Sequence, residues 1–209
     1  MYSLVQQSIS HCQRHARTIY MTIGTMMIAI IISFSYQSYQ LTQQNKVADA
    51  FFELTRKGSQ PSIEHLAIFA KKHEGTIFSD LCRLKLAAMY YHLGNNQSLV
   101  IENLEKIITT STRNNMQSLA AYRLANFIKN TDPDKALVLT EKIHTKSLRH
   151  LRGLLRAELY RKNNDQAKAL LEINSLLSDT EIDNESDSKL VIELATQEKR
   201  QIINEQKQT

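Results

Sequence analysis

From residue 61 onward, apolar residues recur every three or four positions, in stretches that end at glycine, asparagine or proline. This period predicts a series of amphipathic helices. Glycine (5) and proline (2) are scarce, so strand and turn signals are few and the sequence predicts an all-α fold. The predicted helices are 61–73, 78–93, 98–110, 116–129, 133–144, 147–162 and 165–177.

Punctuating residues set the ends of these helices. Pro61 suits a first helical turn, and Asp132 before Pro133 is a typical N-cap followed by proline at the first helical position. Gly75 and Gly94 follow predicted helix ends. An acidic linker at 179–187 precedes one more apolar stripe at 188–202, which predicts a closing helix. Residues 204–209 are polar enough to fray.

A different pattern occupies residues 19–36, which contain no charge. As a helix this run spans roughly 27 Å at about 1.5 Å per residue, close to the ~30 Å hydrocarbon core of a bilayer. Arg14 and Arg17 precede it and Lys46 is the next charge, so the positive-inside rule predicts a cytoplasmic N-terminus. We expect a short tail at 1–18, a transmembrane anchor at 19–36 that continues as helix to Lys57, and an outer domain at 46–205.

A cleaved signal peptide is the alternative interpretation of this run. Such peptides have a shorter apolar region and end in small residues of the A-x-A kind. The run here leaves the membrane through Ser33 to Ser38 with no alanine among them, which favours an uncleaved anchor. A chain cut after Ser35 or Ser38 would overturn that prediction.

The predicted helices form pairs that repeat. Ala87, Ala125 and Ala157 hold equivalent places in the first helices of successive pairs and lie 38 and 32 residues apart. A tetratricopeptide repeat has a period of about 34 residues and a small residue where its two helices approach. A degenerate tetratricopeptide-like solenoid is therefore expected, although any stack of helical hairpins places alanines on an inner face.

Composition and motifs exclude several classes of function. The net charge of +5 falls to +3 beyond residue 40, too little to indicate nucleic-acid binding. The sequence has no phosphate-binding loop, nucleophile elbow, dinucleotide fingerprint or metal-ligand spacing, so we expect no catalytic activity, cofactor or metal. The predicted topology separates Cys12 from Cys82, and Cys82 is expected in the core.

Two segments resemble a known family, the ancillary (YfgM-like) subunit of the bacterial SecYEG translocon. The first is Phe69-Ala70-Lys71-Lys72-His73-Glu74-Gly75-Thr76 followed by Leu84-Lys85-Leu86-Ala87. The second is Leu151-Arg152-Gly153-Leu154-Leu155-Arg156-Ala157-Glu158 followed by Asn163-Asn164-Asp165-Gln166-Ala167. The likeness extends over most of 19–205. It departs before the anchor, where family members usually carry an acidic, aromatic stretch and residues 1–17 here contain no acid.

The resemblance implies an inner-membrane protein with a periplasmic domain that contacts the SecYEG translocon, a membrane-anchored periplasmic chaperone and newly exported polypeptides, without catalysis. The alternatives are an adaptor for another cell-envelope complex, an exported lipid-binding or enzyme-accessory protein, and, last, an enzyme. The repeat register places a peptide-binding groove on the first-helix positions that flank the packing alanines. The predicted groove residues are Leu84, Tyr91, His92, Tyr122, Asn126, Leu154, Glu158 and Arg161.

Overall fold

The computed structural model describes residues 21, 25–35, 38, 42, 44–56, 62–94, 96–178 and 186–206. The chain divides into two compact units, Met1–Arg56 and Lys57–Thr209. All regular secondary structure in the described residues is helical, which confirms the predicted all-α fold.

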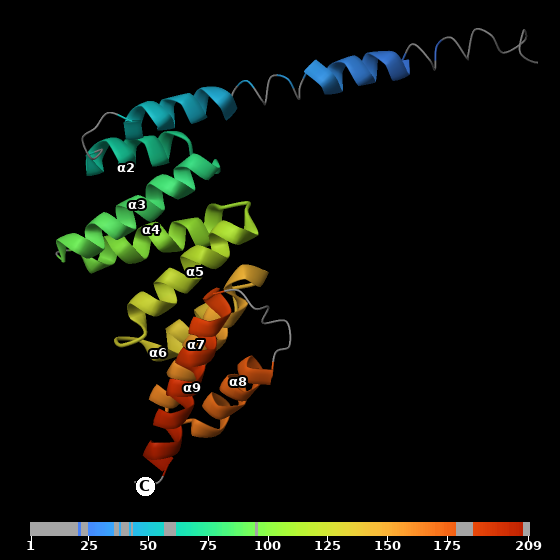
Figure 1. Ribbon diagram of the computed structural model, residues 1–209. Coiled ribbons are helices and arrows are strands. Elements are labelled where there is room, and N and C mark those ends of the chain that lie inside the picture. The colour runs from blue at the N-terminus through green and yellow to red at the C-terminus, as the bar shows by residue number, and fades with distance from the viewer. Residues whose placement is uncertain are drawn as a thin grey trace, which may run out of the picture. The chain divides into compact units, whose positions relative to one another are not determined.

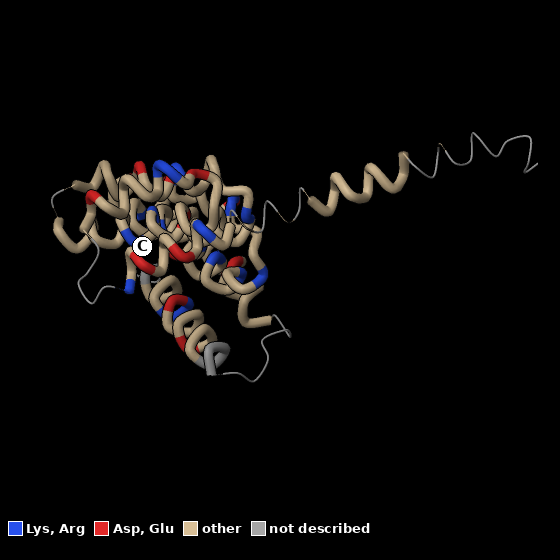
Figure 2. Tube along the Cα trace, turned by 90° about the horizontal axis from the view of Figure 1, so that it is seen from above, with Lys and Arg blue, Asp and Glu red and all other residues tan. Residues whose placement is uncertain are grey.

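The first unit contains described helical residues at 25–35 and 44–56. Residues 25–35 carry no charge (Figure 2). Their large apolar side chains are more than half exposed. Within the described residues, no helix combines the length and the apolar character needed to cross a membrane. Residues 19, 20, 22–24 and 36 of the predicted anchor lie outside the described residues, so the anchor stays a prediction.

The second unit is an array in which each helix packs against the next one along the chain (Figure 1). The last helix, α9, packs against both α7 and α8. Such nearest-neighbour packing is typical of helical repeat arrays. The elements are α2 (Ile63–Lys72), α3 (Ile77–Leu93), α4 (Gln97–Thr110), α5 (Asn114–Ile128), α6 (Pro133–Thr140), the 3-10 turn η1 (Lys146–Leu148), α7 (Arg149–Lys162), α8 (Gln166–Ser178) and α9 (Ser186–Gln206).

Most predicted helix ends agree with the structure to within two residues, because local capping decides them. Asp132 Oδ1 accepts a hydrogen bond from Lys135 N at 2.9 Å, with Pro133 in the first turn. Gly94 ends α3 with φ +70°, a left-handed conformation that glycine adopts without strain. Pro61 and the predicted helix end at Lys57 lie outside the described residues, as does the part of the acidic linker at 179–185.

The predicted end of α6 was wrong by one turn: the helix stops at Thr140, and the sequence predicted residue 144. Beyond Thr140 the chain continues in short turns, in which Lys142 N donates to Leu139 O and Ile143 N to Thr140 O, and its next polar groups bond to other helices. His144 N donates to Ser118 Oγ on α5 at 3.1 Å, and Ile143 O accepts from Arg152 Nη1 on α7 at 2.9 Å. Short turns followed by tertiary hydrogen bonds thus take the place of the last predicted helical turn.

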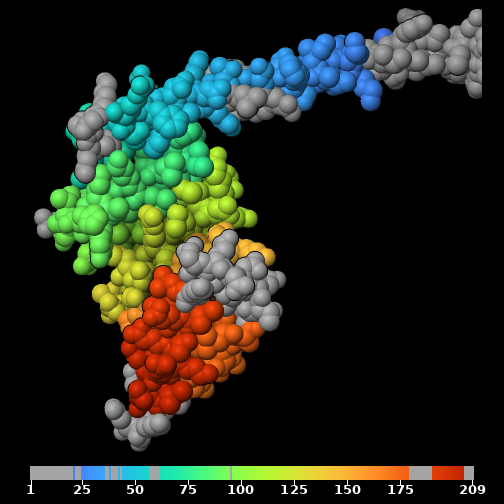
Figure 3. Space-filling view, viewed as in Figure 1, coloured from blue at the N-terminus to red at the C-terminus, as the bar shows by residue number. Residues whose placement is uncertain are grey.

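The predicted fraying from residue 204 was also too early, because α9 continues to Gln206. This helix is anchored by Ala195 and Ile202, both buried against Ile173 and Leu176 of α8. In the space-filling view α9 lies along α8 at the surface of the array (Figure 3). The closing helix expected from the apolar stripe at 188–202 is therefore present, and it packs on α7 and α8.

Candidate protein-binding groove

Small residues allow the helices of each pair to approach closely. Ala87, Ala125 and Ala157 are all buried, as the repeat pattern predicted. The helix contact at Gly153 on α7 is especially close, because a Cβ atom added at this position would lie 2.9 Å from Leu176 Cδ2 on α8. The close packing of α7 on α8 thus depends on the absence of a side chain at residue 153.

One hollow of about 550 Å³, here called the first hollow, lies between α3 and α5 over part of α4. Its walls are mainly apolar and aromatic, and none of its lining residues is acidic. The lining residues are Leu84, Ala87, Ala88, Tyr91, His92, Val100, Leu104, Tyr122, Arg123, Asn126, Phe127, Lys129 and Asn130.

Aromatic side chains form one edge of the first hollow. The rings of Tyr91 on α3 and Phe127 on α5 meet edge to face, with their centroids 5.8 Å apart. Tyr91 is nevertheless 61% exposed. An exposed ring held in place by a second ring offers apolar contact area at a small entropic cost on binding.

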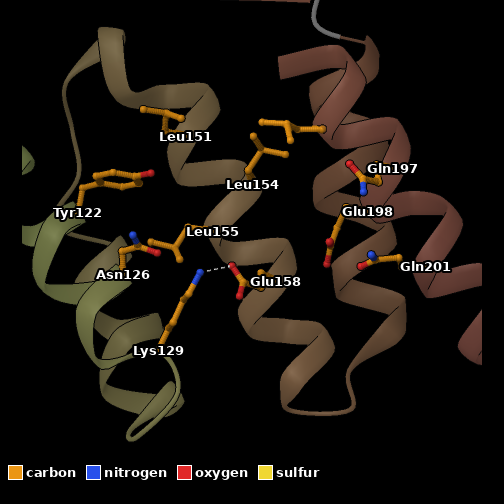
Figure 4. A pocket seen from close by; sticks show the side chains of 11 residues that line it. Tyr122, Asn126, Lys129, Leu151, Leu154, Leu155, Glu158, Gln197, Glu198 and Gln201 are labelled. Carbon is orange, nitrogen blue, oxygen red and sulfur yellow. Dashed lines mark hydrogen bonds and ion pairs between the residues drawn. The ribbon is translucent and has the colours of Figure 1, made fainter. Parts of the chain in front are cut away.

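A second hollow of about 340 Å³ lies among α5, α7 and α9 (Figure 4). Leu151 and Leu154 lie toward one end of it, and Lys129 and Glu158 toward the other (Figure 4). An apolar end and a polar end therefore face the same space. The lining residues are Tyr122, Asn126, Lys129, Leu151, Leu154, Leu155, Glu158, Leu194, Gln197, Glu198 and Gln201.

The two hollows share Tyr122, Asn126 and Lys129. They therefore adjoin along α5, and the two hollows together are called the groove here. Seven of the eight predicted groove residues line it: Leu84, Tyr91, His92, Tyr122, Asn126, Leu154 and Glu158.

Arg161, the eighth predicted residue, lines neither hollow. Its Nε lies 2.7 Å from Glu198 Oε1, and Glu198 is part of the wall that α9 contributes. The ion pair between Arg161 and Glu198 thus links α7 to α9, the helix that forms one wall of the groove.

An ion-pair network crosses the shared part of the groove. Lys129 Nζ lies 2.8 Å from Glu158 Oε2, and Lys162 Nζ lies 3.3 Å from Glu158 Oε1. Burial alone raises the pKa of Glu158, but the hydrogen bonds and charges of the two lysines outweigh it and lower this pKa below its ordinary value of 4.5. Glu158 therefore stays ionised with two cations beside it.

Several groove residues were missed by the sequence analysis. Arg123 and Phe127 lie one turn apart on α5, next to the predicted positions Tyr122 and Asn126, and Asn130 follows just beyond its end, so the helix period carried the signal. The four residues from α9, Leu194, Gln197, Glu198 and Gln201, had no such signal, because the linker before α9 gives no register for its packing.

Other reactive side chains lie apart from the groove. Cys82 is fully buried, and this burial raises its thiol pKa to about 11 despite the nearby charges of Lys85 and Arg83. Burial and the charge of Lys72 lower the pKa of His73. In the described parts of the chain, no three His, Cys, Asp or Glu side chains gather in a way that would hold a metal ion.

A family model described as "Tetratricopeptide repeat-like domain" matches residues 10–191. The chain belongs to this tetratricopeptide repeat-like family. Neither a curated protein nor a solved structure matches it. Domains of this family are typically non-catalytic scaffolds that bind other proteins, which fits a groove with mixed apolar and polar walls.

Proposed function

We propose that this tetratricopeptide-like protein is a membrane-anchored, non-enzymatic helper of the Sec translocon, which receives newly exported polypeptides in its groove. The two adjoining hollows, lined by residues from Leu84 to Gln201, are the observation that carries the proposal. Apolar walls supply affinity for many unfolded segments, and Asn126 with the glutamines of α9 supplies hydrogen bonds to varied backbones.

The membrane anchor at 19–36 is the second part of the proposal. The uncharged run is long enough to cross a bilayer, and Arg14 with Arg17 would hold its start in the cytoplasm. The family match begins at residue 10, so this run belongs to the matched region. The groove would then face the periplasm of a bacterial inner membrane.

The place at the translocon rests on the resemblance to the ancillary SecYEG subunits. The resembling segments contain Ala70, Ala87 and Gly153, which are the small residues at close helix contacts. The resemblance therefore involves residues that determine how the helices of the array pack. The proposed partners are the translocon itself, a membrane-anchored periplasmic chaperone and exported chains.

Site-specific photo-crosslinking in membranes tests this function. A photoreactive amino acid would replace Tyr36, which lies outside the described residues, or Tyr91 or Tyr122 in the groove. We expect translocon subunits to be captured at position 36, and exported chains at positions 91 and 122. Capture of one stable envelope complex at all three positions, with no exported chains, would instead identify an adaptor.

A paired substitution tests the groove separately. Tyr91→Ala with Tyr122→Ala should reduce the capture of exported chains by a probe at Asn126, because both rings line the first hollow. Val138→Ala with Leu171→Ala is the control, since both side chains are exposed and neither lines the groove. Equal capture by the two double variants, with unchanged thermal unfolding, would show that the groove is not the binding surface.

A further inference from the structure

Three connections between helices lie side by side along one edge of the array. The connection from α2 to α3 contains Gly75, whose carbonyl oxygen accepts a hydrogen bond from Arg113 Nη1 at 3.4 Å, just before α5. Two residues further on, Asn115 Oδ1 accepts a hydrogen bond from Thr145 Oγ1 at 3.4 Å, in the connection from α6 to α7. The connections at 73–76, 111–113 and 141–148 are therefore neighbours in space.

Cations outnumber acids on this edge, which is called the basic edge here. Glu74 is one of its acids, and Lys106 of α4, which is not part of the edge, lies 3.0 Å from it. The three connections, with the two residues before and the one residue after each, carry six cations, Lys71, Lys72, Arg113, Lys142, Lys146 and Arg149, and two acids, Glu74 and Glu141.

The opposite edge does not have this imbalance. Asn163 Nδ2 donates a hydrogen bond to Asp134 Oδ1 at 2.8 Å, which brings the connection from α5 to α6 beside the one from α7 to α8. The cations of these two connections have acidic partners on the helices, namely Glu158 for Lys129 and Lys162, and Glu198 for Arg161. Charge therefore distinguishes the two edges of the array.

The predicted anchor would keep the array close to a bilayer. Twenty-six residues separate the end of the predicted anchor at 36 from the start of α2 at Ile63. They span about 40 Å as a helix and at most about 90 Å as an extended chain. A tether of this length gives a high effective concentration of the lipid surface, so individually weak contacts become sufficient.

We propose that the basic edge faces the bilayer that holds the anchor and binds the headgroups of anionic lipids. Lysine and arginine side chains are attracted to lipid phosphates over about 8 Å at physiological salt, and they need no pocket for this contact. None of the six cations lines either hollow, so the groove stays open to clients. This inference rests on the membrane anchor of the proposed function.

An acidic segment of the same chain would oppose the contact with lipid. The linker between α8 and α9 carries Asp179, Glu181, Asp183 and Glu185, and its residues 179–185 lie outside the described residues. These carboxylates compete with lipid phosphates for cations and are repelled by anionic headgroups. Replacement of the four acids by the corresponding amides should therefore strengthen the contact between the basic edge and the bilayer.

Energy transfer in lipid nanodiscs tests this orientation on the full chain. A donor dye on Ser147→Cys marks the basic edge, a donor on Ser98→Cys at the start of α4 is the control, and acceptor dyes label the headgroups. Cys12→Ser removes a competing thiol, and Cys82 is buried. Transfer from residue 147 should rise about twofold when phosphatidylglycerol replaces part of the phosphatidylcholine, and should fall again in about 0.5 M salt. Transfer from residue 98 should not rise.

Paired variants assign the effect to the edge. Lys142→Gln with Lys146→Gln should reduce the rise to about half, because two of the six cations are lost. Lys142→Arg with Lys146→Arg keeps both charges and should keep the full rise. Lys85→Gln with Arg200→Gln removes the same charge from exposed positions outside the edge and should also keep it. Thermal unfolding of each variant checks that the fold is retained.

The outcomes separate this inference from the proposed function. Equal transfer from residue 147 in the two kinds of disc, or a larger rise from residue 98, would overturn the orientation and leave the anchor in place. An equal reduction in the Lys85/Arg200 variant would show that net charge is responsible, and weaker contact after neutralisation of the linker would also contradict the proposal. If the chain does not enter the discs, the anchor and the proposed function fail together with this inference.

Discussion

Lys129 at the end of α5 and Glu158 in the middle of α7 form a 2.8 Å ion pair that joins two successive repeats across the groove. Both side chains are about three-quarters buried, so solvent screens their attraction less than at an open surface. The pair therefore contributes to stability and also fixes the distance between two walls of the groove.

The lowered pKa of Glu158 predicts a loss of stability in acid. Glu158 binds protons less readily in the folded chain than in the unfolded chain, so its contribution is present above pH 4.5 and is lost as the pH falls through its lower folded value. The Glu158→Gln variant lacks this titration. Urea unfolding from pH 7 to pH 3 should show the wild type losing about 0.5–1 kcal/mol more than Glu158→Gln. Parallel pH profiles of the two proteins would contradict the prediction.

Gly153 and Leu176 should be energetically coupled. Gly153→Ala introduces a Cβ 2.9 Å from Leu176 Cδ2, and such overpacking costs about 1–3 kcal/mol. The same substitution gains about 1 kcal/mol from helix propensity. In a Leu176→Ala background the contact is absent, so Gly153→Ala should stabilise the protein by about that amount.

Chemical denaturation of the four proteins in this cycle measures the coupling. The effect of Gly153→Ala should change sign, or at least shift by about 1–2 kcal/mol, between the two backgrounds. An identical effect in both backgrounds would show that α7 and α8 adjust freely to the added methyl group.

The raised pKa of the Cys82 thiol predicts that the protein loses stability in alkali. Burial raises its pKa from 9.0 to about 11, so the folded chain holds the thiol proton more tightly than the unfolded chain. Its contribution is complete below pH 9 and is lost as the pH rises toward 11, by about 2 kcal/mol.

Comparison in a Cys12→Ser background isolates this effect. The protein that retains Cys82 should lose more stability between pH 8.5 and pH 11 than the Cys82→Ala variant does. The native thiol should also react slowly with thiol reagents at pH 8 and quickly in denaturant, because it is fully buried. Rapid labelling of the folded chain would place Cys82 at the surface.

The buried hydrogen bond between Ser111 and Asp80 should matter more than an exposed one. Ser111 Oγ donates to Asp80 Oδ2 at 2.6 Å, and both residues are buried between the start of α3 and the end of α4. Ser111→Ala leaves the carboxylate short of a donor and should cost about 2 kcal/mol. Ser178→Ala removes an exposed hydroxyl and should cost less than about 0.5 kcal/mol. Equal thermal shifts for the two variants would contradict this account.

Local signals account for what the sequence predicted well. Asp132-Pro133 and Gly94 place helix ends through capping and backbone conformation, which depend only on neighbouring residues. The burial of Ala87, Ala125 and Ala157 could be predicted because the repeat pattern directly indicates where the helices must approach each other. Seven of the predicted groove residues line the two hollows, and their role in binding a peptide stays a prediction.

Distant contacts account for what the sequence did not predict. The end of α6 depends on Ser118 and Arg152, which lie 26 and 9 residues from their partners in the chain. Arg161 bonds to Glu198, 37 residues away in the chain, and its position on the helix could not reveal this partner. The residues that α9 contributes to the groove were missed for the same reason, since only three-dimensional packing reveals which helix closes the second hollow.

The order in which the groove walls occur along the chain has a consequence for biogenesis. Neighbouring helices supply most of the packing partners, so the array can fold progressively from α2 onward as the polypeptide emerges. The first hollow is complete once residue 130 has folded, whereas the second waits for residues 194–201 of α9. A nascent chain therefore completes the second hollow only after nearly the whole array has formed.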